Sequence, residues 1–206
     1  MVTSAKMAAS AAAAGGAGTA GYFIARNIQT EDNSIASKID TKYLLKSTDS
    51  EQWKARVTTL KSAQDADITA QLKTLKDKGD SLKEGDLQEW CNSSLKSQFS
   101  NKETTEFKNI LTYCAYTLGD KVTGTKITSS TANTDNKLGA IWTTIKGLDA
   151  SGKMSGGLKQ VKGTQNGDTG NAGSDAVKTW CLKQYQVPYY ENESDLTESQ
   201  NYCILK

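Results

Sequence analysis

Each of the four cysteines in this chain directly follows an aromatic residue, and this pairing constrains the fold more than any other feature of the sequence. The four pairs are Trp90-Cys91, Tyr113-Cys114, Trp180-Cys181 and Tyr202-Cys203. Because aromatic residues occupy 7% of all positions, chance would give this arrangement with a probability on the order of 10⁻⁵. The pattern therefore indicates an internal repeat.

The spacing of the pairs gives the length of the repeated unit. Equivalent residues lie 89 or 90 positions apart: Trp53 and Trp142, Trp90 and Trp180, Cys114 and Cys203. Pairing "VTTLK" at 57–61 with "WTTIK" at 142–146 would give a different offset, and we prefer the Trp53–Trp142 pairing because it keeps the offset of the cysteines. We predict two related units of about 90 residues, at 27–118 and 119–206.

The fold class follows from the spacing of apolar residues. Leu87, Cys91, Leu95 and Phe99 recur every four positions, as on one face of a helix. "SNKE" at 100–103 has the form of a capping box that starts a second helix. Further helices are predicted after "TDSE" at 48–51 and over "DITAQLKTLK" at 67–76; Val is scarce and the chain has one proline. We predict an all-α protein of two helical bundles.

The second unit departs from the first between residues 147 and 174. This stretch is rich in glycine and contains "GTQNGDTGNAG". Because glycine at this density costs too much backbone entropy for a helix, we expect a long Gly-rich loop with no counterpart to the "DITAQLKTLK" helix.

The amino terminus contains 19 residues without a charge, from Met7 to Ala25, between Lys6 and Arg26. A helix of this length is just able to span a hydrocarbon core of about 30 Å. We expect residues 1–26 to be a signal anchor or transmembrane segment that holds the chain to a membrane through residues 7–25. A cleaved signal peptide and an Ala-rich soluble helix are the alternatives.

Three roles are open to Cys91, Cys114, Cys181 and Cys203. Disulfides within each unit, Cys91–Cys114 and Cys181–Cys203, suit an exported chain with a small core. Reduced cysteines acting as small buried apolar residues are the second possibility. A four-cysteine zinc site is the third, although no C-x₂₋₄-C spacing occurs. We expect disulfides, with Trp53, Trp90, Trp142 and Trp180 as core anchors.

Several classes of function are disfavoured by what the chain lacks. It contains no histidine, which removes Ser-His-Asp and Cys-His catalysis and imidazole metal sites. The phosphate-binding motif G-x-x-x-x-G-K-[ST] and the nucleophile motif G-x-S-x-G are also absent. Basic and acidic residues are interspersed, with a net charge of +2, which is no footprint for nucleic acid. We expect no enzyme, cofactor, metal site or nucleic-acid partner.

These features together resemble a known family. A small-residue N-terminal span followed by units of the form "W…(E/T)WC…(T/N)YC", with the opening "SIASKIDTKYLLKSTDSEQW", resembles the paralogous families of uncharacterised membrane-anchored proteins of haemotropic mycoplasmas. The resemblance implies a surface antigen or interaction module at the cell membrane, with most of the chain extracellular and the host surface or another copy as partner. A thiol-disulfide redox protein and a secreted helical protein are the alternatives.

Overall fold

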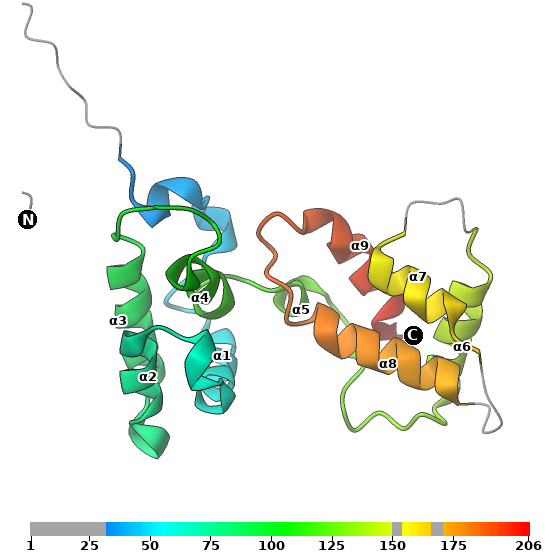
Figure 1. The fold of residues 1–206 in the computed structure, drawn as a ribbon. Coiled ribbons are helices and arrows are strands. Elements are labelled where there is room, and N and C mark those ends of the chain that lie inside the picture. The colour runs from blue at the N-terminus through cyan, green and yellow to red at the C-terminus, as the bar shows by residue number, and fades with distance from the viewer. Residues whose placement is uncertain (1–31, 150–153, 166–170) are drawn as a thin grey trace, which may run out of the picture. The chain divides into compact units, whose positions relative to one another are not determined.

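The computed structural model describes residues 32–149, 154–165 and 171–206. Asp32–Lys206 form one compact body. These described residues are mostly helical, as predicted for an all-α fold (Figure 1). No helix among them has both the length and the hydrophobicity needed to cross a membrane. The predicted span, Met7 to Ala25, lies outside the described residues.

Two sets of elements follow one another along the chain, separated near residue 115. The first set is η1 (Ile35–Lys38), η2 (Thr41–Tyr43), α1 (Ser50–Ser62), η3 (Asp65–Asp67), α2 (Ala70–Lys76), η4 (Gly79–Ser81), α3 (Glu84–Ser94) and α4 (Thr105–Tyr113). The second set is α5 (Leu118–Lys121), β1 (Thr125–Lys126), α6 (Asn136–Lys146), α7 (Gly156–Gly163), α8 (Ala172–Gln184), α9 (Glu193–Tyr202) and β2 (Ile204–Leu205). We call these sets the first and second unit.

Each unit has its own hydrophobic core. The first core includes Leu60, Leu72, Leu87 and Ile110, all fully buried. The second core is built from the equivalent helices and includes Leu138, Ile145, Leu158 and Val177. Burial of these aliphatic side chains is the main force that orders helices as short as these.

The prediction of a long Gly-rich loop at 147–174 is wrong for the residues that the structure describes. Helix α7 lies within this stretch, and α8 already begins at Ala172. The sequence "LKQVK" at 158–162 repeats "LKTLK" at 72–76 of helix α2. The two helices also begin alike. The side chain of Thr69 accepts a hydrogen bond from the backbone of Leu72, and that of Ser155 accepts one from Leu158. Helix α7 is therefore the counterpart of α2 that the glycine content concealed.

The alignment of α6 with its counterpart α1 also differs from the prediction, which paired Trp53 with Trp142. The buried positions of α1 include Trp53, Arg56 and Leu60, whereas those of α6 are Leu138, Ile141 and Ile145. This pattern aligns "ARVTTLK" at 55–61 with "AIWTTIK" at 140–146. Trp53 therefore corresponds to Leu138, and Trp142 to Val57. The alternative "VTTLK"/"WTTIK" pairing fits the structure.

Both units begin with a similar segment that precedes the first long helix. These start segments are Ser34–Ile39, "SIASKI", and Thr117–Val122, "TLGDKV". Each pairs with the chain that follows the third long helix of its own unit: the amide of Ile35 donates to the carbonyl of Ser97, and that of Leu118 to Val187. The two start segments are therefore equivalent in structure as well as in sequence.

The starts of two helices in the first unit illustrate the precision of cap signals. Helix α4 begins at Thr105 with Thr104 as its N-cap, so the capping box predicted at 100–103 is displaced by a few residues. The N-cap of α1 is Asp49, inside the predicted "TDSE" at 48–51. The side chain of Asp49 accepts a hydrogen bond from the amide of Lys46, which precedes the helix, and none from the amides of α1.

Candidate functional site

The structure brings together the cysteines that were predicted to pair. Cys91 of α3 is joined to Cys114 at the end of α4, with their Cα atoms 5.7 Å apart. Cys181 of α8 is joined to Cys203 at the end of α9, with Cα atoms 5.3 Å apart. All four are buried, and none of the described cysteines is free. Each unit is thus closed by one disulfide at the same place in its core.

The predicted tryptophan anchors differ in their environments. Trp53, Trp90 and Trp180 are buried, and the indole N–H of Trp53 donates to the carbonyl of Lys46 at 2.8 Å. Trp142 is only partly buried, although its indole nitrogen is inaccessible and has no hydrogen-bond partner in the described structure. Trp142 stands where the first unit has Val57, so the larger ring lies at the margin of the second core.

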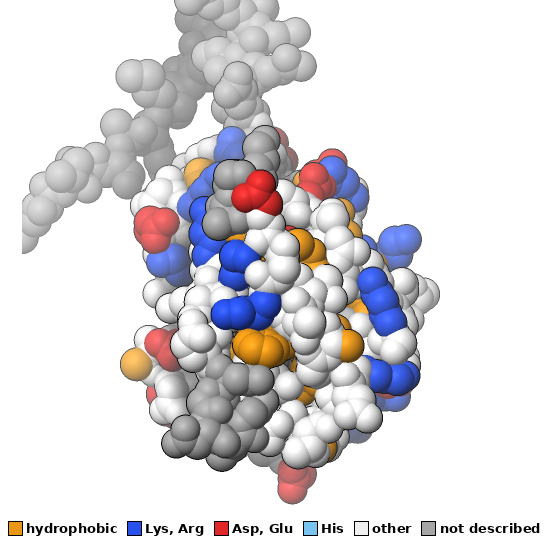
Figure 2. All heavy atoms as spheres, turned by 90° about the vertical axis from the view of Figure 1, so that its right-hand side faces the viewer, with side chains coloured by type: hydrophobic (Ala, Val, Ile, Leu, Met, Phe, Trp, Pro, Cys, Tyr) orange, Lys and Arg blue, Asp and Glu red, His pale blue; other side chains and the backbone are white. Residues whose placement is uncertain are grey.

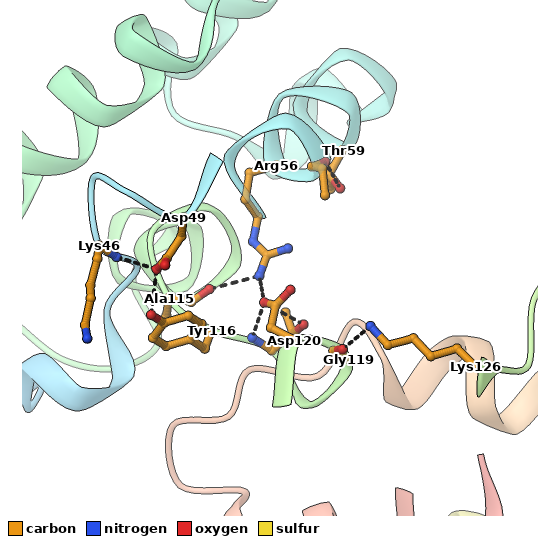
Figure 3. A network of polar contacts seen from close by, with 11 residues as sticks. Lys46, Asp49, Arg56, Thr59, Ala115, Tyr116, Gly119, Asp120 and Lys126 are labelled. Atoms are coloured by element: carbon orange, nitrogen blue, oxygen red, sulfur yellow. Dashed lines mark hydrogen bonds and ion pairs between the residues drawn. The ribbon is translucent and has the colours of Figure 1, made fainter. Parts of the chain in front are cut away.

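The two units meet at a buried ion pair that sequence analysis did not single out (Figure 3). Nη2 of Arg56, on α1, contacts Oδ2 of Asp120, on α5, and also donates to the carbonyl of Ala115 at 3.1 Å. The same Asp120 oxygen accepts hydrogen bonds from the amide and hydroxyl of Thr117. The side chains of Arg56 and Asp120 are 6% and 12% exposed, so water screens their attraction weakly.

A hydrogen bond between Tyr116 and Asp49 lies beside this ion pair (Figure 3). The hydroxyl of Tyr116 donates to Oδ2 of Asp49 at 2.6 Å, and burial together with this hydrogen bond raises the pKa of Tyr116 to about 12. Burial alone would raise the pKa of Asp49, but the hydrogen bonds from Tyr116 and from the amide of Lys46 outweigh it, so this pKa is lowered. The ammonium of Lys121 lies 3.3 Å from the Tyr116 ring centroid, and burial lowers its pKa.

Aromatic residues between α8 and α9 extend the contact between the units. The ring of Tyr43, in the first unit, lies 5.6 Å from that of Tyr189 and 5.4 Å from that of Tyr190. Tyr190 also packs against Phe107 of the first core, with 6.1 Å between the ring centroids. Glu193 accepts a hydrogen bond from the Tyr43 hydroxyl at 2.6 Å. "PYYE" at 188–191 was a detectable aromatic signal, but only the fold shows what it contacts.

Two of the hollows on the second unit are large enough to hold a small molecule or a short peptide. One, of about 640 Å³, runs between α7 and α8 and is lined by Trp180, Thr179, Gln160 and both glycines of "SGG" at 155–157. The other, of about 530 Å³, lies beside α6 and the end of α9 and is lined by Ala140, Ile141, Thr144 and Tyr202, among others. Figure 2 shows one face of this unit, where small apolar patches are separated by polar side chains and lysines.

No group of three or more Cys, Asp or Glu side chains is placed to hold a metal ion within the described ranges. Several exposed carboxylates there are paired with lysines, as Asp65 is with Lys73 and Lys76. Such pairs are the ordinary solvated surface of a helical protein.

Comparisons with protein-family models, with curated proteins and with solved structures find no match for this chain.

Proposed function

We propose that the chain is a non-catalytic, membrane-tethered surface protein of the mycoplasma-type family that it resembles, built from two related helical units and acting as an antigen or interaction module. The observation that carries the proposal is the repeated buried disulfide, one in each unit. Structural disulfides persist in oxidising surroundings such as the cell exterior. The uncharged stretch from Met7 to Ala25 supplies the tether.

The burial of the cysteines favours a structural role over a redox one. Cys181 and Cys203 are fully buried, and Cys91 and Cys114 nearly so. A redox-active cysteine needs an accessible sulfur and a stabilised thiolate. Thiol-disulfide exchange is therefore the less favoured function, and exchange faster than that of free cysteine, abolished by Cys91→Ser, would establish it.

The proposal is tested by following the chain in intact cells. We expect the full chain to sediment with membranes and to be digested by protease added outside, while a cytoplasmic protein in the same cells stays intact. A version starting at Asn27 should be soluble. Protection from the protease would contradict surface display. An N-terminal sequence beginning between residues 20 and 30, with the chain in the medium, would establish the secreted alternative.

A further inference from the structure

The contact between the units joins a start segment to a receiving surface. In the second unit, Asp120 of the start segment Thr117–Val122 contacts Arg56 of α1, and Gly119 lines a small hollow together with Ala55 and Thr59. The hollow that remains between these residues is only about 150 Å³. We call Ala55, Arg56 and Thr59 of α1 the receiving surface of this contact.

The receiving surface occurs a second time, on α6. In the register established above, Ala55, Arg56 and Thr59 correspond to Ala140, Ile141 and Thr144. Those three residues line the hollow of about 530 Å³ beside α6, which no described segment fills. Thr144 is exposed where Thr59 is half-buried. Ala55 and Ala140 are both exposed, and Arg56 and Ile141 are both buried. The surfaces therefore differ in that Asp120 contacts the one on α1, whereas the one on α6 borders an unfilled hollow.

The start segment also occurs a second time, at Ser34–Ile39. Its inward residues Ile35 and Ile39 are buried in the first core, as their equivalents Leu118 and Val122 are buried. Its outward residue Ser37 is exposed, whereas the equivalent Asp120, which contacts Arg56 of the first unit, is half-buried. The chain thus carries two start segments and two receiving surfaces, and its internal contact uses one of each.

We infer that the surface Ala140–Ile141–Thr144 receives the Ser34–Ile39 segment of a second copy of this chain, so that copies associate head to tail. The contact continues an interface already present inside the chain, with the same elements in the same roles. Such a contact is heterologous and does not close on itself, so it produces rows of molecules rather than symmetric dimers. The inference names the partner within the proposed interaction function, since a tether concentrates copies on one membrane.

The residues at the centre of this contact make it weaker than the internal one. Ser37 takes the place of Asp120, and Ile141 takes the place of Arg56. The proposed contact therefore lacks both charges of the internal ion pair. No buried charge is left without a partner when the copies separate. A reversible association follows from this exchange.

Cysteine cross-linking on the purified full chain tests the geometry. Ser37→Cys and Thr144→Cys chains, mixed and treated with a short thiol cross-linker, should give a product that contains one of each. The matched control is Thr143→Cys, because Thr143 is also exposed and lies next to Thr144 on α6 but corresponds to Thr58, outside the contact. Equal cross-linking through Thr143→Cys, a product from Thr144→Cys alone, or no product would overturn the inference.

A second experiment introduces the missing charges into the same contact, which should make the copies associate more tightly. A Ser37→Asp chain mixed with an Ile141→Arg chain recreates the pair seen between Asp120 and Arg56, and should associate at least about tenfold more tightly than the unmodified chains. A chain that carries both Ser37→Asp and Ile141→Asp should not associate, because every contact between its copies would bring two carboxylates together. Circular dichroism establishes that each variant is folded, and an unfolded Ile141→Arg chain leaves cross-linking as the deciding result. Because both measurements use purified chain, they are independent of whether the protein reaches the cell surface.

Discussion

Gly157 lies so close to Trp180 that a Cβ atom placed on this glycine would be 2.6 Å from the indole nitrogen. Real Cβ atoms do not come this near to another heavy atom, so the glycine permits the close packing of α7 on α8. Gly173 has the same relationship to Trp142, whose ring atoms would lie 2.2–2.4 Å from a Cβ. Gly157 and Gly173, both in the stretch 147–174, are thus sites of close packing against a tryptophan ring.

The first prediction concerns this packing. Gly157→Ala should lower the free energy of unfolding by about 1–3 kcal/mol, because the added methyl group forces the Trp180 ring or the α7 backbone to move. The matched control is Gly156→Ala, since a Cβ at Gly156 meets nothing within 4 Å. That change should be neutral or stabilise the protein by up to about 1 kcal/mol. Urea denaturation of both variants measures the difference, and equal effects would contradict the packing argument.

The second prediction concerns the disulfides. Replacing Cys181 and Cys203 together with Ala should cost roughly 3 kcal/mol, the value expected for opening a loop of this length. Replacing Cys91 and Cys114 should cost a similar amount, because the two loops span 22 and 23 residues. Thermal unfolding with and without reductant measures both. Denatured, non-reduced protein from its native location should show no thiol that reacts with a labelling reagent, whereas four reactive thiols would indicate a reduced chain.

The third prediction concerns the ion pair between the units. Asp120→Asn should cost about 3–5 kcal/mol, because it leaves the buried charge of Arg56 without its partner while keeping an acceptor for Thr117. The double change Asp120→Asn with Arg56→Met should cost less than Asp120→Asn alone, since no uncompensated charge remains. The control is Glu51→Gln, which removes an exposed pair with Lys54 and should change stability by less than about 0.5 kcal/mol. A double variant less stable than the single one would contradict this account.

The fourth prediction concerns alkaline pH. Tyr116 and Tyr185 each have a pKa raised to about 12, mainly by burial, against an ordinary value of 10.0. Between these values the unfolded chain releases protons that the folded chain retains, so folding becomes less favourable as pH rises from about 10 to 12. Below pH 10 this contribution is fully present. Denaturation midpoints from pH 8 to 11.5 should fall, and the fall should be smaller in Tyr116→Phe.

The matched control for this experiment is Tyr189→Phe. Its ring belongs to the same contact between units, packing on Tyr43. A loss of pH dependence as large in Tyr189→Phe as in Tyr116→Phe would show that the effect comes from general loosening of the contact rather than from the hydroxyl that Asp49 holds.

The sequence by itself determined the features that depend on local spacing. Apolar residues at helical intervals predict the helical fold class, because a helix face recurs every three or four residues. The aromatic-cysteine pairs predict which cysteines lie together, because two neighbouring helices of similar length bring their stripes into contact. The burial of Trp53, Trp90 and Trp180 follows from the same stripes.

Only the tertiary structure decided the features that depend on partners distant in sequence. The glycine content argues against helix α7. Burial of Leu158 and Val161 nevertheless outweighs the entropic cost of glycine in a helix, and Gly157 leaves the space that the Trp180 ring requires. The α1–α6 register depended on which residues face each core, and this placed Trp142 at the margin. Arg56 and Asp120 are 64 residues apart, and nothing near either residue in the sequence indicates that folding buries them together.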